Sequence, residues 1–179
     1  VAHGALERDA SQRAAIEKLQ ALADALAGRR PKSVSVTQAL LATFRPRAQP
    51  AHGLYLWGPV GRGKTFLMNM FFGALPVEKK RRAHFHAFMA DVHDRLHRLR
   101  QKPRSGRADP VSCVAQDIAQ ETRVLCFDEF AVHDVADASI VARLFSSLLA
   151  SGVVIVATSN VEPSRLYEGG RNRDLFLPF

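Results

Sequence analysis

The sequence predicts an α/β fold in which a parallel sheet is flanked by helices. After residue 50, short apolar stretches alternate with longer segments of helical periodicity. This alternation is typical of parallel strands joined by crossover helices. The composition agrees, because 47% hydrophobic and 23% charged residues over 179 positions allow one substantial buried core.

Residues 1–50 are predicted to form an N-terminal helical segment followed by a linker. Apolar residues recur at helical spacing over residues 5–27. Pro46 and Pro50 then interrupt the chain, because a proline in a helix interior removes a hydrogen bond and clashes with the preceding turn. We therefore expect a domain boundary near residue 50, with the second unit over residues 51–179.

Four strands and four helices are predicted in the second unit. The strands are expected over residues 53–57, 82–88, 123–127 and 153–158. The helices are expected over residues 64–74, 90–101, 110–121 and 136–150, with a loop over residues 102–109. The third and fourth strands contain uninterrupted apolar runs, Val124 to Phe127 and Val153 to Ala157, as expected for central strands of a sheet that is covered on both faces.

A glycine-rich loop follows the first predicted strand and matches the phosphate-loop pattern at every fixed position: Gly58, Pro59, Val60, Gly61, Arg62, Gly63, Lys64 and Thr65. Glycine is needed because the chain must curl around a phosphate with its amides pointing inward. Lys64 is expected to reach the β- and γ-phosphates, and Thr65 to place its hydroxyl on Mg²⁺. The predicted cofactors are ATP and Mg²⁺. The strand before the loop and the helix after it argue against a chance match.

Two acidic residues, Asp128 and Glu129, follow the third strand. Asp128 is expected to hold Mg²⁺ directly or through water, since ligands bind at the carboxyl ends of parallel strands. Glu129 suits a base that orients and deprotonates the attacking water, which favours an ATP hydrolase over a guanine-nucleotide switch. Asn160, after the fourth strand, is expected to hold the same water or to sense the γ-phosphate. The alternatives are a helix N-cap for the acids and an ordinary turn for the asparagine.

The chain is strongly basic, with a formal net charge of +8. Basic residues gather in two clusters: Lys79, Lys80, Arg81 and Arg82, then Arg95, Arg98, Arg100, Lys102, Arg104 and Arg107. Neither cluster is interleaved with the aromatic residues on which single-stranded nucleic acids stack. A solvated basic face is therefore favoured over a patch for an anionic partner, and nucleic acid stays open as a partner. Without an apolar run that could span a bilayer or the layout of a signal peptide, an intracellular location is expected.

These motifs, together with the strings at residues 84–89 and 176–179, resemble the ZapE family of AAA+ ATPases, which is related to the mitochondrial lactation-elevated ATPases. The resemblance covers residues 53–179. It implies a P-loop NTPase of the AAA+ type whose ATP hydrolysis remodels a protein partner. The implied partner is the FtsZ ring of dividing bacteria. The implied location of the protein is the bacterial cytoplasm, with peripheral contact to the membrane. A mitochondrial matrix quality-control ATPase, a nucleic-acid-associated ATPase such as a helicase loader, and an inactive scaffold are the alternatives.

The resemblance also assigns residues that chemistry alone does not. It implies that Arg173 is an arginine finger that reaches a neighbouring subunit of a homo-oligomer, with a surface arginine as the alternative. His86, expected near the end of the second strand with His84 on the same face, stands where related proteins restrain the catalytic glutamate. A histidine packed at a strand end is favoured over that role. Since the chain stops at Phe179, we expect a fragment without the C-terminal lid.

Overall fold

The computed structural model describes residues 10–28, 53–101, 109–132 and 135–167. Within these ranges the strands form one four-stranded parallel sheet in the order β1-β4-β3-β2. The strands are β1 (Leu54–Trp57), β2 (Lys80–His84), β3 (Val124–Asp128) and β4 (Val154–Ser159). The predicted parallel α/β architecture is confirmed.

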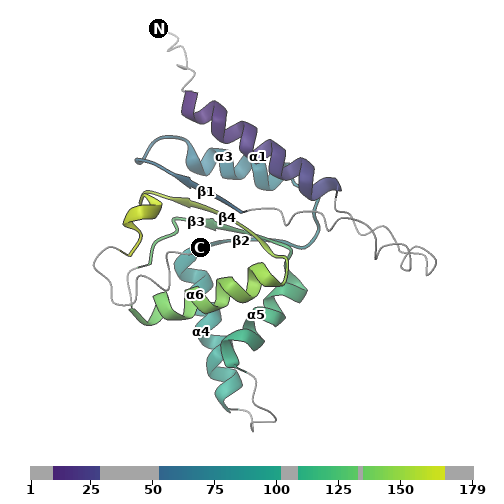
Figure 1. Ribbon diagram of the computed structural model, residues 1–179, viewed down its shortest axis with the longest axis vertical. Helices are drawn as coiled ribbons and strands as arrows, with labels where there is room; N and C mark the ends of the chain where they lie inside the picture. Colours follow the sequence, from purple (N-terminus) through teal and green to yellow (C-terminus); the bar gives the residue numbers. More distant parts are fainter. Residues whose placement is uncertain (1–9, 29–52, 102–108, 133–134, 168–179) are drawn as a thin grey trace, which may run out of the picture.

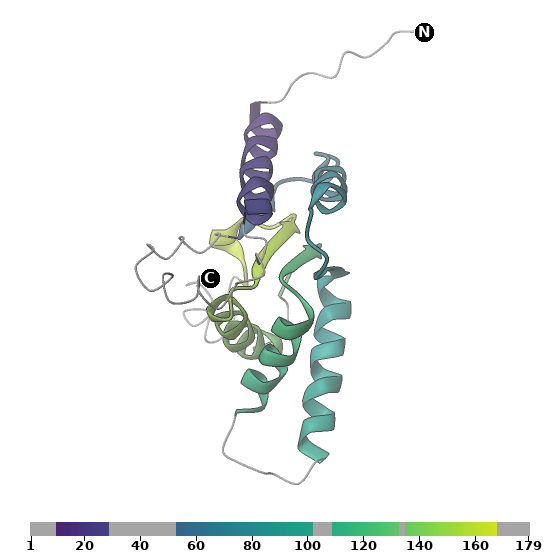
Figure 2. The same ribbon diagram turned by 90° about the vertical axis from the view of Figure 1, so that its right-hand side faces the viewer.

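Helices cover both faces of this sheet (Figure 1). One face carries α1 (Ala10–Gly28) and α3 (Lys64–Ala74), and the other carries α4 (Phe85–Gln101), α5 (Pro110–Glu121) and α6 (Val135–Ala150). Figure 2 shows the same layers from the side, with α1 and α3 next to each other above the strands. A short 3₁₀ helix, η2 (Pro163–Arg165), follows β4.

Each face of the sheet has its own hydrophobic core, because successive side chains of a strand point to opposite faces. Leu125 and Phe127 of β3 pack in the core beneath α4, α5 and α6. Val124 and Cys126, the residues between them, pack in the core beneath α1 and α3. All residues of β3 are buried, as predicted for a central strand.

The N-terminal helix is part of the second core. Leu19, Leu22 and Leu26 lie on one face of α1 at helical spacing and are almost fully buried among residues of α3, β3 and β4. This confirms the predicted amphipathic helix over the described part of that segment. Residues 29–52, which contain the predicted linker and domain boundary, lie outside the described residues, so that division stays a prediction.

The second strand differs from its prediction. β2 ends at His84, and the residues from Phe85 onward form the first turns of α4, so the predicted strand over residues 82–88 and the position of His86 near its end were wrong. The reason is periodicity: the buried residues Phe85, Phe88, Met89, Val92 and Leu96 recur at helical spacing, which places them all on one helix face.

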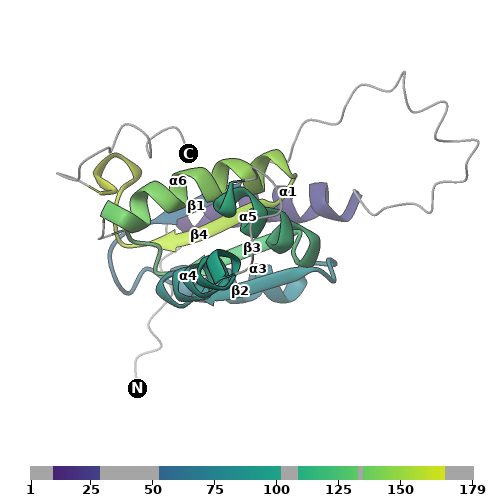
Figure 3. The same ribbon diagram turned by 90° about the horizontal axis from the view of Figure 1, so that it is seen from below.

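The four strands end at the same edge of the sheet. Trp57 of β1 lies in register with Ser159 of β4, and His84 of β2 lies in register with Asp128 of β3. Figure 3 shows β4 between β1 and β3. The residues that follow β4 are therefore placed between those that follow β1 and those that follow β3.

Candidate nucleotide-binding site

An open cavity of about 390 Å³ lies at the carboxyl edge of the sheet. Three segments line it, at the carboxyl ends of β1, β3 and β4 in turn: Val60, Gly61, Arg62, Gly63, Lys64 and Thr65; Glu129; and Thr158, Ser159 and Asn160. The structure thus brings together most of the site residues predicted from sequence. Arg173 lies outside the described residues.

The backbone of the glycine-rich loop has the curled form that anion binding needs. Gly61 and Gly63 have φ angles of 84° and 75°, a left-handed conformation in which a Cβ is strained. Gly63 is the N-cap of α3, and a glycine has no side chain that could accept hydrogen bonds from the first amides of the helix. The first amides of α3 are therefore available to an anion, and the helix dipole favours negative charge there.

Lys64 is held by the loop itself. Its Nζ donates hydrogen bonds to the carbonyl oxygens of Gly58 at 2.6 Å and Pro59 at 2.7 Å. Burial lowers the pKa of this ammonium group below its ordinary value. A positive charge therefore stands inside the phosphate loop, bound to two neutral oxygens that a phosphate would replace.

Glu129 occupies a tight turn at the end of β3. Its φ of 55° is uncommon for a residue with a side chain, and its exposed side chain lines the cavity. The turn is tied to the end of β4: the amide of Glu129 donates to Thr158 Oγ1 at 3.4 Å, and the amide of Phe130 donates to the Thr158 carbonyl at 2.7 Å. The neighbouring strand thus fixes the backbone that carries Glu129.

The end of β4 is also tied to the phosphate loop. The amide of Gly58 donates to the Ser159 carbonyl at 3.3 Å, and Ser159 Oγ donates to the Phe130 carbonyl at 2.6 Å. The exposed Asn160 therefore lies between the loop and the acidic pair, as the strand order requires. Thr158 and Ser159 line the cavity too, although the sequence analysis assigned a role only to Asn160.

Asp128 is buried and engaged by an arginine that the sequence analysis did not link to the site. Arg82 of β2 donates from Nε to Asp128 Oδ2 at 2.6 Å and from Nη2 to Oδ1 at 3.0 Å. Arg82 Nη1 also donates to Oδ1 of Asn69 on α3. Asp128, the predicted ligand of Mg²⁺, thus forms a bidentate ion pair with Arg82.

The residues present fit Mg-ATP. The loop amides and Lys64 suit a polyphosphate, and the cavity between the loop and Glu129 gives it room. No group of three or more His, Cys, Asp or Glu residues that could hold a metal occurs among the described residues. Mg²⁺ in nucleotide sites needs no such group, because it takes one or two protein ligands with phosphate oxygens and water. Thr65 and Asp128 would serve in that role.

His84 and His86 both lie at this edge, with ring centroids 5.8 Å apart. His84 ends β2 in register with Asp128, whereas His86 lies in the first turn of α4. Both side chains are exposed. His84 therefore has the strand-end position that the sequence analysis gave to His86.

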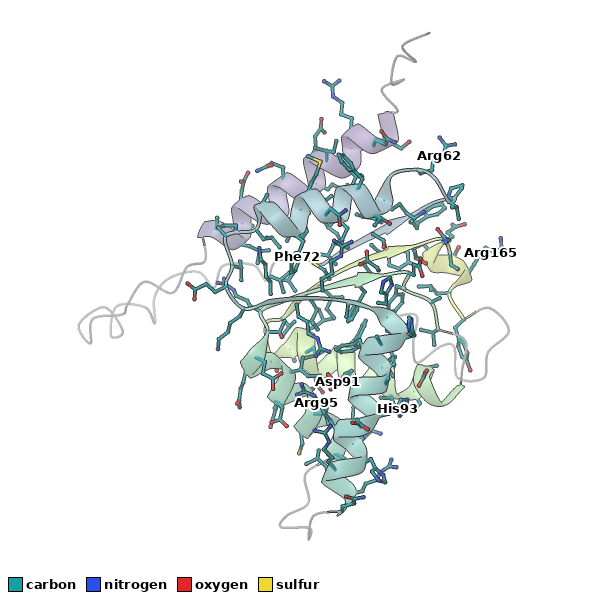
Figure 4. The ribbon with its side chains drawn as sticks, turned by 180° about the vertical axis from the view of Figure 1, so that it is seen from behind. Arg62, Phe72, Asp91, His93, Arg95 and Arg165 are labelled. Atoms are coloured by element: carbon teal, nitrogen blue, oxygen red, sulfur yellow. The ribbon has the colours of Figure 1, made fainter. Side chains whose placement is uncertain are left out.

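Several arginines of the basic clusters are paired within the chain. Arg81 contacts Asp91 at 2.8 Å, and Arg95 contacts Asp91 at 3.2 Å and Glu121 at 3.0 Å. Burial opposes ionisation of Asp91, but hydrogen bonds from both arginines outweigh it and hold its pKa below the usual value. Figure 4 shows Asp91 and Arg95 together on α4, far from Arg62 of the phosphate loop. These arginines are partly exposed and are paired with carboxylates of the same chain, and the choice between a solvated basic face and a patch for an anionic partner stays a prediction.

A phosphate loop at the carboxyl edge of a parallel sheet, with an acidic pair at the end of β3 and β4 inserted between β3 and β1, defines a P-loop nucleotide-binding protein of the AAA+ type. The family model of the AFG1-like ATPases matches residues 1–179, and the chain belongs to this family. The resemblance to the ZapE group is thereby confirmed. None of the described helices combines the length and apolarity needed to cross a membrane.

Two curated relatives and one solved structure illustrate the match. Cell division protein ZapE of Escherichia coli K12 is 49% identical over 129 residues, which cover 72% of this chain and 33% of that protein. Lactation elevated protein 1 homolog B of Danio rerio is 48% identical over 139 residues, which cover 74% of this chain and 28% of that protein. Domain III of the replication initiation protein DnaA from Thermotoga maritima has a TM-score of 0.63 at 17% identity, and the match covers 95% of this chain and 59% of that chain. At this identity the match supports the fold alone. The chain spans about a third of the length of these curated relatives.

Proposed function

We propose that this chain is the nucleotide-binding part of a Mg²⁺-dependent ATPase that couples hydrolysis to remodelling of a protein partner. The observation that carries the proposal is the cavity in which the phosphate loop, Glu129 and Asn160 meet. A phosphate held by the loop and a water held by the other two residues would be neighbours there. This is the arrangement that hydrolysis of a terminal phosphate requires.

Each residue has a role that follows from its chemistry. Lys64 and the first amides of α3 bind the phosphates, with Thr65 and Asp128 as ligands of Mg²⁺. The metal supplies positive charge that offsets the charge developing on the phosphate oxygens. Glu129 orients and deprotonates the attacking water, and Asn160 holds that water or senses the terminal phosphate.

The partner is proposed from the family. One relative is named for cell division, which favours a bacterial protein that acts in the cytoplasm on the division machinery, with FtsZ as the polymer and peripheral membrane contact. The lactation-elevated relative favours the alternative of a mitochondrial protein. Arg173, from a neighbouring copy in an oligomer, is proposed to complete the site.

The test is Mg-ATP hydrolysis by the parent, Lys64→Ala and Glu129→Gln, with Glu78→Gln as the matched control. Glu78 is exposed and precedes β2 at the opposite edge of the sheet. We expect turnover by the parent and the control, ATP binding without turnover for Glu129→Gln, and loss of binding for Lys64→Ala. Equal turnover by Glu129→Gln and the parent would remove Glu129 from its role. A parent that binds no ATP would refute the proposal.

The partner class is tested in the same assay by adding FtsZ or DNA. Stimulation by FtsZ supports the division role. Stimulation by DNA that falls steeply with added salt supports the nucleic-acid alternative, because phosphate contacts release condensed counterions.

A further inference from the structure

The pairing of Arg82 with Asp128 places a fixed positive charge at the carboxylate proposed for Mg²⁺. Two of its nitrogens contact the two different oxygens of Asp128, at 2.6 Å and 3.0 Å. The side chains are only 21% and 11% exposed, so the pair is largely withdrawn from solvent. A two-pronged arginine–carboxylate contact of this kind is strong and directional.

Arg82 also reaches the helix that begins at the phosphate loop. Its third nitrogen donates to Asn69, which lies four residues after Thr65 and therefore one turn further along the same face of α3. The guanidinium group thus lies between β3 and α3, in contact with Asp128 and with the residue one helical turn after Thr65. Arg81, the preceding residue of β2, points to the opposite face and pairs with Asp91 of α4.

We infer that Arg82 is an internal counter-ion that takes the place of Mg²⁺ at Asp128 and sets the magnesium dependence of nucleotide binding. The inference rests on the proposed function of the site. Without metal, Arg82 neutralises a carboxylate that would otherwise repel a polyphosphate. With metal, the guanidinium group competes with the ion for the same two carboxylate oxygens. Arg82 is therefore a positioning residue, acting through Asp128.

Loss of the charge at Arg82 has two effects, and both raise the preference of the site for Mg-ATP over metal-free ATP. Metal-free ATP binds more weakly, because the carboxylate of Asp128 is left unneutralised near the phosphates. Mg-ATP binds more tightly, because the metal no longer competes with an arginine. The ratio of the dissociation constant in EDTA to that in excess Mg²⁺ therefore rises. We expect a rise of roughly tenfold for one charge next to a divalent ion at the edge of a protein.

The experiment titrates the full chain with ATP in EDTA and in excess Mg²⁺. Fluorescence of Trp57 reports binding, because this single tryptophan is 53% exposed and directly precedes the phosphate loop. The variant is Arg82→Gln. The control is Arg81→Gln, which loses the same charge and an ion pair from the same strand. We expect the ratio to rise in Arg82→Gln and to match the parent in Arg81→Gln.

An unchanged or smaller ratio in Arg82→Gln, with normal ATP binding by the parent, overturns this inference and leaves the proposed function intact. A parent that binds no ATP overturns both. If circular dichroism shows that Arg82→Gln is unfolded, Arg82→Met decides: it also removes the charge but keeps an unbranched side chain of similar length, and an unchanged ratio again overturns the inference. In an Asp128→Asn background, Arg82→Gln should no longer raise the ratio. A rise that persists there would overturn the role of Asp128.

Discussion

Substitution of Lys64 by alanine should separate the stability of the loop from its ability to bind nucleotide. In the free protein, the variant loses two hydrogen bonds from a charged group to the carbonyl oxygens of Gly58 and Pro59. These contacts are partly exposed, so we expect a loss of about 1–2 kcal/mol in the free energy of unfolding. The variant should remain folded, because no core residue is changed.

The larger effect concerns the bound state. Mg-ATP at a hundred times its dissociation constant stabilises a folded protein by about 2.7 kcal/mol. For a chain of this size, that corresponds to a rise of about 5–10 °C in melting temperature. We expect the rise in the parent and its loss in Lys64→Ala, measured by differential scanning fluorimetry with and without Mg-ATP.

Lys79→Ala is the matched control for this measurement. Lys79 is also a lysine whose Nζ donates to a backbone carbonyl, that of Gln120 at 2.7 Å, but it lies just before β2, at the edge of the sheet away from the loop. The control should keep the full rise with Mg-ATP. A Lys64→Ala protein that keeps most of the rise would refute the assignment of Lys64 to phosphate binding.

Three further predictions concern stability and reactivity. Gly53→Ala should cost about 3 kcal/mol in urea unfolding, because the new Cβ would collide with the backbone carbonyl of Ile155 in β4; an unchanged midpoint would contradict this packing. Burial raises the pKa of the Cys126 thiol to about 12, so iodoacetamide near pH 8 should modify it only after unfolding, as mass spectrometry can show. A hydrogen bond from Arg95 holds the pKa of Glu121 below its usual value, so the stability that this pair adds is present above the unfolded pKa of about 4.3 and is lost as the pH falls through the folded value. The parent should therefore exceed Glu121→Gln in stability by a constant amount from about pH 7 to 5, and this difference should shrink below about pH 4 in urea titrations; a pH-independent difference would exclude the pairing.

The phosphate loop was predictable because its chemistry is local. Glycine is required at Gly61 and Gly63 by the backbone angles themselves, and Lys64 and Thr65 follow at fixed spacing. The central strands were predictable because β3 and β4 are buried on both faces and are therefore apolar except at their carboxyl ends.

What the sequence did not reveal depends on contacts between distant segments. His86 was misplaced because a short apolar and polar alternation fits both a strand and the start of an amphipathic helix. Only the burial of Phe88 together with Phe85, at helical spacing, distinguishes the two. The pair between Arg82 and Asp128 joins residues far apart in the chain. It requires knowing that β2 and β3 are neighbours in register, which composition and periodicity do not specify.

The position of β4 between β1 and β3 also has a consequence for how the molecule assembles. Among the described strands, β1 is made first and pairs only with β4, which is made last. A ribosome-bound chain therefore carries the phosphate loop on an unpaired strand until β4 emerges. Such long-range pairing is slow to form, and the unpaired strand is open to aggregation or to chaperones meanwhile. The capacity to bind nucleotide should thus appear late in synthesis, when the last described strand enters the sheet.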